Sequence, residues 1–242
     1  MLGLEFADLS PAEAAALIAS RGAGAPFRYV VTPNADHLVR LARQPALLPL
    51  YHNAALCLMD SRVVARAAGA IGLAVPRVTT GSDLTERLLC GHVVPGERVT
   101  IIGLRAAHVP SLIARCGIAP PAHYDPPIGF DRDPAQLRRA VDFVLDHPAR
   151  LVFLAVGSPR QERLAAAIAA TGKAVGTGLC IGASLDFLAG AERRAPQWTQ
   201  RAGLEWLHRL AADPKRLARR YLLDNPPVFA MLLRERMARS RG

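Results

Sequence analysis

Strand-like runs of apolar and β-branched residues alternate with helical patterns along residues 1–190. The clearest runs are Arg28–Thr32, Ala55–Met59, Val99–Gly103, Leu151–Val156 and Ala174–Gly178. Between them, helical spacing with Gly or Pro near its ends covers Ala35–Arg43, Arg62–Ala70, Asp83–Cys90, Arg105–Cys116, Pro134–Leu145 and Gln161–Ala170. Continuous apolar strands separated by helices are typical of parallel strands buried on both faces. The pattern therefore predicts an α/β fold with right-handed crossovers.

The pattern changes after Gly190, because no strand-like run follows. Three helical patterns cover Trp198–Leu210, Pro214–Leu223 and Pro227–Met237, and two of them begin at cap-plus-proline sequences. We expect an α/β core over residues 1–190, with a division into two small lobes near 95–150 as one alternative. Residues 191–242 should form a helical appendage.

The appendage carries most of the net charge of +10, with 12 Arg and Lys against 5 Asp and Glu. An excess of this kind suits an anionic partner, whether a nucleic acid, a phosphorylated substrate or an acidic membrane face. A nucleic-acid-binding α/β protein stays an alternative. With two Trp, four Tyr and no aromatic-basic interleaving, the sequence favours no nucleic acid as partner.

The segment from Pro227 combines Phe229, Met231, Leu232 and Leu233 with arginines, as helices on anionic bilayers do. The chain has no apolar stretch long enough to span a membrane. Its N-terminus meets Glu5 and Asp8 at once, which argues against a secretory signal. We expect a cytoplasmic protein that associates peripherally with the inner face of the cell membrane.

Cysteine, histidine and acidic patterns give little support for metal or disulfide chemistry. The four cysteines, Cys57, Cys90, Cys116 and Cys180, form no CxxC, and we expect them to be small buried hydrophobes with reduced thiols. Asp131 and Asp133 form a DxD, the spacing by which many glycosyltransferases hold a divalent ion. Because Pro134 follows, Asp133 is more simply explained as a helix N-cap. A metal site at this DxD stays the alternative.

Polar residues follow several expected strands, where ligands bind in parallel sheets. Asn34 and Asp60 suit helix N-caps as well as chemistry, and Asp60 is also a candidate catalytic base. Gly176, Gly178 and Gly182 are expected at the end of the last strand and in the loop after it, where backbone amides could approach a phosphate. The spacing is GxGxxxG, so this signal for a nucleotide is weak.

Seven short motifs follow one another along the sequence in a fixed order. They are Thr32-x-Asn34, Asp60, Arg77-Val-Thr-Thr-Gly-Ser-Asp-Leu84, Gly157-x-Pro-x-Gln-Glu162, Gly182-Ala-Ser-Leu-Asp-Phe-Leu-Ala-Gly190, Arg194-Ala-Pro-x-Trp198, and Leu204-Glu-Trp-Leu-His-Arg209 followed by Pro214-x-Arg-Leu-x-Arg-Arg-Tyr221. With these motifs the chain resembles the WecG/TagA/CpsF family of bacterial glycosyltransferases from Arg28 to Tyr221. One departure is Asp60-Ser61, where the family commonly has Asp-Gly.

The resemblance implies a Rossmann-like fold and inverting sugar transfer from a nucleotide donor, typically a UDP-sugar such as UDP-N-acetylmannosamine. The acceptor would be linked to a polyprenyl diphosphate, in surface polysaccharide or teichoic acid synthesis. Neither a metal nor another cofactor is implied, and a homo-oligomer is compatible with the sequence.

The resemblance also implies roles for single residues. Asp60 would be the general base, and Thr32 and Asn34 would line the sugar pocket. Arg77 and Gln161 would contact the nucleotide diphosphate. The appendage arginines would close over the site, namely Arg209, Arg216 and Arg219. Their planar guanidinium groups suit a departing diphosphate where no metal is held.

Overall fold

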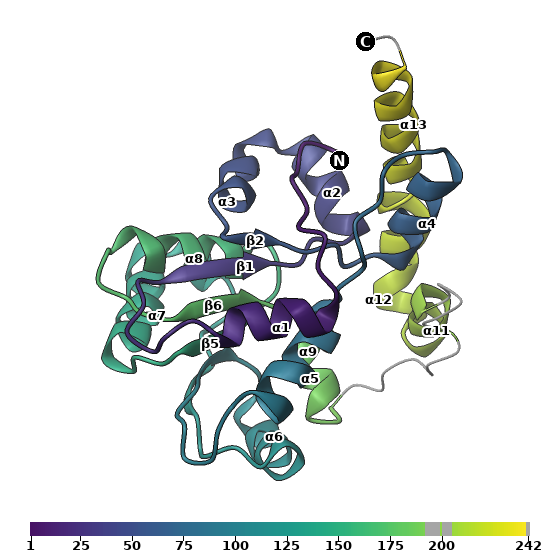
Figure 1. The fold of residues 1–242 in the computed structure, drawn as a ribbon. Coiled ribbons are helices and arrows are strands. Elements are labelled where there is room, and N and C mark those ends of the chain that lie inside the picture. Colours follow the sequence, from purple (N-terminus) through teal and green to yellow (C-terminus); the bar gives the residue numbers. More distant parts are fainter. Residues whose placement is uncertain (192–198, 200–204, 241–242) are drawn as a thin grey trace.

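The protein is built around one sheet of six parallel strands in the order β2-β1-β6-β5-β3-β4 (Figure 1). The computed structural model describes residues 1–191, 199 and 205–240. The strands are β1 (Arg28–Val31), β2 (Leu56–Cys57), β3 (Thr100–Gly103), β4 (Ala122–Tyr124), β5 (Leu151–Ala155) and β6 (Thr177–Cys180). The expected α/β, Rossmann-like fold is confirmed. One sheet includes strands from both sides of residues 95–150, so the core does not divide into two separate sheets there.

Helices cover both faces of this sheet (Figure 1). One face carries α2 (Ala35–Arg43), α3 (Leu48–His52), α4 (Arg62–Ala70), α7 (Pro134–Asp146) and α8 (Arg160–Ala170). The other carries α1 (Pro11–Ala19), α5 (Gly81–Gly91), α6 (Val109–Cys116) and α9 (Ser184–Leu188). Short 3₁₀ turns are η1 (Pro45–Leu47), η2 (Ala106–His108) and η3 (Phe130–Arg132).

The strand side chains alternate between two apolar cores, one on each face. Val152 and Leu154 of β5 pack with α7 and α8, whereas Leu151 and Phe153 pack with α5 and α6. All four are fully buried. Burial on both faces explains why the sequence of this strand is a continuous apolar run.

Two strands differ from the sequence prediction. β6 begins at Thr177 rather than ending at Gly178, because Thr177 pairs with Arg28 of β1 and with Leu151 of β5. β4 was not predicted. Its sequence Ala-His-Tyr is short and half-buried at the edge of the sheet, so it carries no apolar pattern.

The C-terminal region is helical among its described residues, as expected. It contains α11 (Glu205–Ala212), α12 (Pro214–Arg219), the π-helix η4 (Arg220–Asp224) and α13 (Pro227–Arg239). The predicted start of the first of these helices, at Trp198, lies outside the described residues. α13 lies beside α4 and also contacts α2 (Figure 1). Its Val228 and Leu232 are 1% exposed and belong to the core, so α13 packs as part of the core rather than as a separate peripheral helix.

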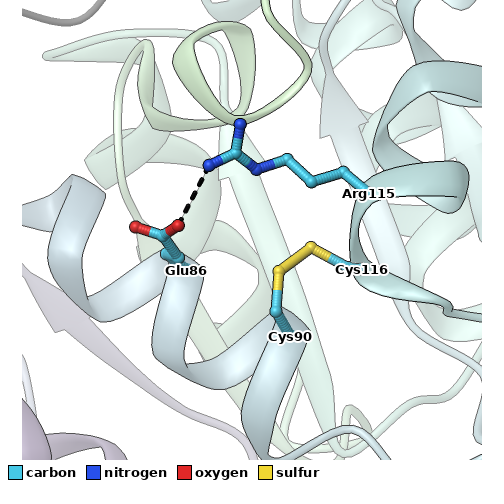
Figure 2. The surroundings of a disulfide bond; sticks show 4 residues. All are labelled: Glu86, Cys90, Arg115 and Cys116. Carbon is cyan, nitrogen blue, oxygen red and sulfur yellow. Dashed lines mark hydrogen bonds and ion pairs between the residues drawn. A yellow bond between two sulfur atoms is a disulfide. The ribbon is translucent and has the colours of Figure 1, made fainter.

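A disulfide joins Cys90, near the end of α5, to Cys116, the last residue of α6 (Figure 2). The expectation of reduced thiols is wrong for this pair. The fold brings the two helix ends to a Cα–Cα distance of 4.4 Å, although 26 positions separate the cysteines in sequence. Arg115 forms an ion pair with Glu86 beside them, at 3.1 Å. Cys57 and Cys180 are free and buried, as expected.

Within the described ranges, none of the helices combines the length and hydrophobicity that a bilayer crossing requires.

Candidate active site

The carboxyl ends of β1, β2 and β6 bring Thr32, Asp60 and Ser184 around the first turn of α5. Gly81 is the first residue of that helix. A β-carbon at Gly81 would lie 3.1 Å from Oγ1 of Thr32 and 3.2 Å from Oγ of Ser184. Only glycine fits this approach without a shift of its neighbours, which explains the residue at this position.

Asp60 is held against the N-terminus of α5. The backbone N–H of Gly81 donates to Oδ2 of Asp60 at 3.2 Å, and the Asp60 N–H donates to the carbonyl of Pro33 at 3.1 Å. Ser61, not Asp60, caps α4, because its Oγ accepts from the N–H of Val64. The capping alternative for Asp60 on α4 is therefore wrong, and Ser61 has a structural role of its own. The helix N-terminus favours a carboxylate at this place.

Thr32 and Asn34 both have intramolecular partners. The hydroxyl of the buried Thr32 donates to the carbonyl of Cys180 at 3.0 Å. Asn34 caps α2, since its Oδ1 accepts from the N–H of Asp36 at 3.1 Å. The Asn34 N–H donates to Nδ1 of His37 at 3.0 Å. Burial lowers the pKa of His37 to about 3, so the imidazole is neutral and can accept this bond.

Gln161 and Glu162 are buried in the first turn of α8. The side-chain amide of Gln161 donates through Nε2 to Oε1 of Glu162 at 2.9 Å. Its carbonyl Oε1 accepts from the backbone N–H of Gly182 at 2.8 Å. Both ends of the Gln161 side chain are thus engaged within the protein. Burial raises the pKa of Glu162.

A cavity of about 670 Å³ opens at the carboxyl ends of β3 and β5. Arg105, from the loop after β3, and Arg160, at the start of α8, line it together with His108, Asp125 and Asp186. Among the described residues, neither of the two guanidinium groups pairs with a carboxylate. The cavity therefore offers two cations to an anionic ligand.

The loop after β3 has an unusual backbone. Leu104 has a φ of 64°, a left-handed conformation that non-glycine residues seldom adopt. The preceding Gly103 has a φ of 90°, and a β-carbon there would lie 2.6 Å from the carbonyl oxygen of Ala155. Such backbone conformations are found preferentially at ligand-binding sites. This strand end was not among the predicted site positions, and Arg105 directly after it was the available signal.

Two of the three glycines expected near a phosphate lie elsewhere. Gly176 precedes β6 at the amino edge of the sheet, and Gly178 lies within the strand, packed against Phe27. The phosphate-loop prediction is wrong for both, because it placed the end of the strand at Gly178. Gly182 alone follows the strand, and its N–H is the one bound by Gln161.

Arg77 forms ion pairs with the N-terminal segment of the chain. Its Nε lies 3.2 Å from Oδ1 of Asp8 and its Nη1 lies 2.6 Å from Oε2 of Glu13. Among the appendage arginines, Arg219 is 83% exposed and lies 3.8 Å from Asp224. Arg220 instead approaches Asp36 of α2, at 3.5 Å. The side chains of Arg209 and Arg216 lie outside the described part of the chain.

The DxD carboxylates have structural partners. Asp131 forms an ion pair with Arg163 at 2.7 Å and its side chain is 4% exposed. Asp133 caps α7, as the simpler interpretation predicted, by accepting from the N–H groups of Ala135 and Gln136. Over the described residues, no group of three or more His, Cys, Asp or Glu side chains is arranged to hold a metal.

Comparison with protein families decides the class of the chain. The model of the glycosyl transferase WecG/TagA/CpsF family matches residues 1–242, the whole chain. The chain belongs to this family. It is therefore a glycosyltransferase of surface polysaccharide or teichoic acid synthesis, and the family implies a nucleotide-sugar donor and a lipid-linked acceptor. The order of the seven motifs was sufficient to indicate the family.

Proposed function

We propose that this glycosyltransferase moves a sugar from a UDP-sugar, such as UDP-N-acetylmannosamine or a related hexose donor, to a polyprenyl-diphosphate-linked acceptor, with inversion and without a metal. One observation carries the proposal. Asp60, held by the Gly81 amide, lies at the same edge of the sheet as the cavity lined by Arg105 and Arg160. A candidate base and a candidate diphosphate site thus both lie at the carboxyl ends of the parallel strands.

Asp60 would act as the general base. In an inverting transfer, one base removes the proton from the acceptor hydroxyl while the oxygen attacks the anomeric carbon. The Gly81 N–H binds Oδ2 of Asp60 and orients the carboxylate. Thr32, beside Gly81, would line the sugar pocket together with Asn34, as the family resemblance implies.

Arg105 and Arg160 would neutralise the departing diphosphate, in place of the role assigned to Arg77 by resemblance. Negative charge accumulates on the leaving group in the transition state, and prearranged guanidinium groups stabilise it. Arg77 is occupied by Asp8 and Glu13. Asp131 and Asp133 have partners of their own, which favours arginine over a DxD-bound metal.

The C-terminal helices support peripheral attachment to the inner membrane face. Their exposed apolar side chains are Leu207, Leu222, Leu223, Phe229, Leu233 and Met237. Arg234 and Arg239 are exposed on the same helix as Phe229. Apolar side chains interspersed with arginine bind anionic bilayers through burial and charge together.

A donor screen tests the proposal. Candidate UDP-sugars are incubated with a synthetic polyprenyl-diphosphate-linked acceptor, with and without EDTA, and the anomeric configuration of the product is determined by NMR. We expect transfer from a UDP-sugar with inversion and no loss in EDTA. Activity that is abolished by EDTA and restored by Mg²⁺ or Mn²⁺ would overturn the metal-independent mechanism.

A pair of variants separates the two groups of arginines. With a water-soluble acceptor, Arg160→Ala should lower kcat on the order of 10²-fold, because a charge aimed at the leaving group is lost. Arg219→Ala should have no effect with that acceptor, since its side chain is 83% exposed. An equal loss in both variants would contradict the assignment to the cavity.

A further inference from the structure

Glu162 has an environment that is unusual for a carboxylate. Acidic residues in the first turn of a helix normally face solvent, yet Glu162 is 1% exposed in the first turn of α8. Its Oε1 accepts from Gln161, and its Oε2 is buried without a hydrogen-bond partner among the described residues. Burying a carboxyl with one oxygen unsatisfied opposes folding. A role outside stability would explain why the residue is there.

We propose that Glu162 is a positioning residue, which orients the Gln161 amide so that its carbonyl holds the Gly182 turn beside Asp60. This inference rests on the proposed role of Asp60. Glu162 would act through its hydrogen bond with Gln161 and not on the reacting groups themselves.

Glu162 can fix the orientation of the Gln161 amide because the two ends of an amide differ. One end of the Gln161 side chain can only donate, and the other can only accept. Oε1 of Glu162 accepts whether the carboxyl is ionised or carries a proton on Oε2, so it draws Nε2 of Gln161 toward itself. Oε1 of Gln161 is thereby left facing the N–H of Gly182. In the opposite orientation, the amide NH₂ would face that N–H, and two donors would oppose each other.

The Gly182 turn leads directly to the site. Gly182 has a φ of 56° and connects β6 to α9. Two residues later, the Ser184 hydroxyl donates to the carbonyl of Ile181 at 2.6 Å and lies 3.4 Å from the hydroxyl of Ser82. The same Ser184 oxygen borders Gly81, whose N–H binds Asp60. A shift of the turn would therefore move the first turn of α5 and with it the Asp60 carboxylate.

An exchange of the two side chains tests the inference. In the double variant Gln161→Glu and Glu162→Gln, the amide at 162 can donate to the carboxyl at 161, and the other oxygen of that carboxyl can accept from Gly182. The pair is restored with its polarity reversed. Glu162→Leu alone leaves the Gln161 amide without an acceptor.

We expect Glu162→Leu to lower kcat by roughly 10–100-fold with little change in the donor KM, the size of effect that misplacement of a catalytic group produces. The double variant should recover most of kcat. If Gln161 instead contacts the donor diphosphate, the double variant places a carboxylate against that diphosphate, and it should stay impaired with a raised donor KM. That result, or unchanged kcat in Glu162→Leu, would overturn the inference.

Glu86→Gln is the matched control, because Glu86 lies on the surface of α5 and pairs with Arg115 away from the site. It should leave both kcat and KM unchanged.

A measurement without turnover keeps the inference separable from the proposed function. In protein labelled with ¹⁵N-glycine, the Gly182 amide resonance is assigned by its loss in Gly182→Ala. It should shift in Glu162→Leu and return toward its original position in the double variant. Absence of sugar transfer by the wild type would refute the proposed function, whereas an unmoved Gly182 resonance in Glu162→Leu would refute the role of Glu162.

Discussion

Replacing Leu232 by alanine should destabilise the whole protein, although this residue lies in the last helix of the chain. Leu232 is 1% exposed and packs in the same core as β1, β5 and α2. Truncation of a buried leucine to alanine removes its transfer free energy and leaves a cavity, at a cost of about 2–5 kcal/mol. A chain of this size loses roughly 2–4 °C of melting temperature per kcal/mol. A cost of about 3 kcal/mol therefore corresponds to a fall of roughly 6–12 °C.

Leu233 is the matched control, since it is the next residue and is 52% exposed. Leu233→Ala should change the free energy of unfolding by less than about 0.5 kcal/mol. Leu233→Ala should instead weaken binding to anionic vesicles. Leu232→Ala should leave vesicle binding unchanged. Thermal unfolding followed by circular dichroism and vesicle co-sedimentation measure the two effects. Equal melting temperatures for Leu232→Ala and the wild type would refute the packing of α13 as part of the core.

Three further predictions concern the site, the disulfide and pH. Asp60→Asn should bind donor but lose roughly 10²–10⁴-fold in turnover, and near-normal turnover of the folded variant would reject Asp60 as the base. Dithiothreitol should lower the melting temperature of the wild type by roughly 7–14 °C, because the disulfide closes a loop of 26 residues worth about 3.5 kcal/mol. Cys90→Ser should melt at the same temperature with and without the reductant, and a wild type insensitive to it would contradict the disulfide. Burial raises the pKa of Glu162 above 4.5, so its contribution to stability is complete below pH 4.5 and is lost as pH rises through the folded-state pKa. Urea unfolding across pH should show this loss in the wild type and not in Glu162→Gln, and parallel curves for the two proteins would disprove it.

Local patterns were sufficient to predict those helices whose ends are marked by residues of the same segment. The segments Ala35–Arg43 and Arg62–Ala70 form helices with those bounds. Asn34 and Ser61 supply the caps at their N-termini. Amphipathic spacing and a cap are contained within a dozen residues, so they can be recognised without knowledge of the remaining chain.

Features that depend on distant partners could not be predicted in this way. The position of β6 is set by pairing with β1 and β5, which lie far from it in sequence. The disulfide depends on where α5 and α6 end relative to each other. Arg77 was assigned to the nucleotide diphosphate by resemblance, and its sequence neighbours do not reveal Asp8 and Glu13 as its partners.

The candidate site was predictable in part because strand ends are predictable. Thr32 and Asp60 follow strands that the apolar pattern identified, and parallel pairing brings them to one edge of the sheet. Arg160 comes from the turn after β5, and its position beside Arg105 follows only from the pairing of β3 with β5. The sequence therefore indicates the candidate base more readily than the cations that are proposed to bind the diphosphate.

The packing of the C-terminal region suggests how binding of donor and acceptor is divided in this enzyme. α13 is anchored to the core through Val228 and Leu232, while Phe229 and Leu233 on the same helix are exposed. A helix anchored in this way holds its apolar face at a fixed place relative to the strand ends, whereas a flexible tail would only raise the local concentration of enzyme at the bilayer. If that face binds the membrane, the acceptor diphosphate is presented at a defined height above it. Arg105 and Arg160, which are proposed to bind the donor, line the cavity at the strand ends of the core. Attachment to the membrane would then contribute to orientation at the active site as well as to recruitment.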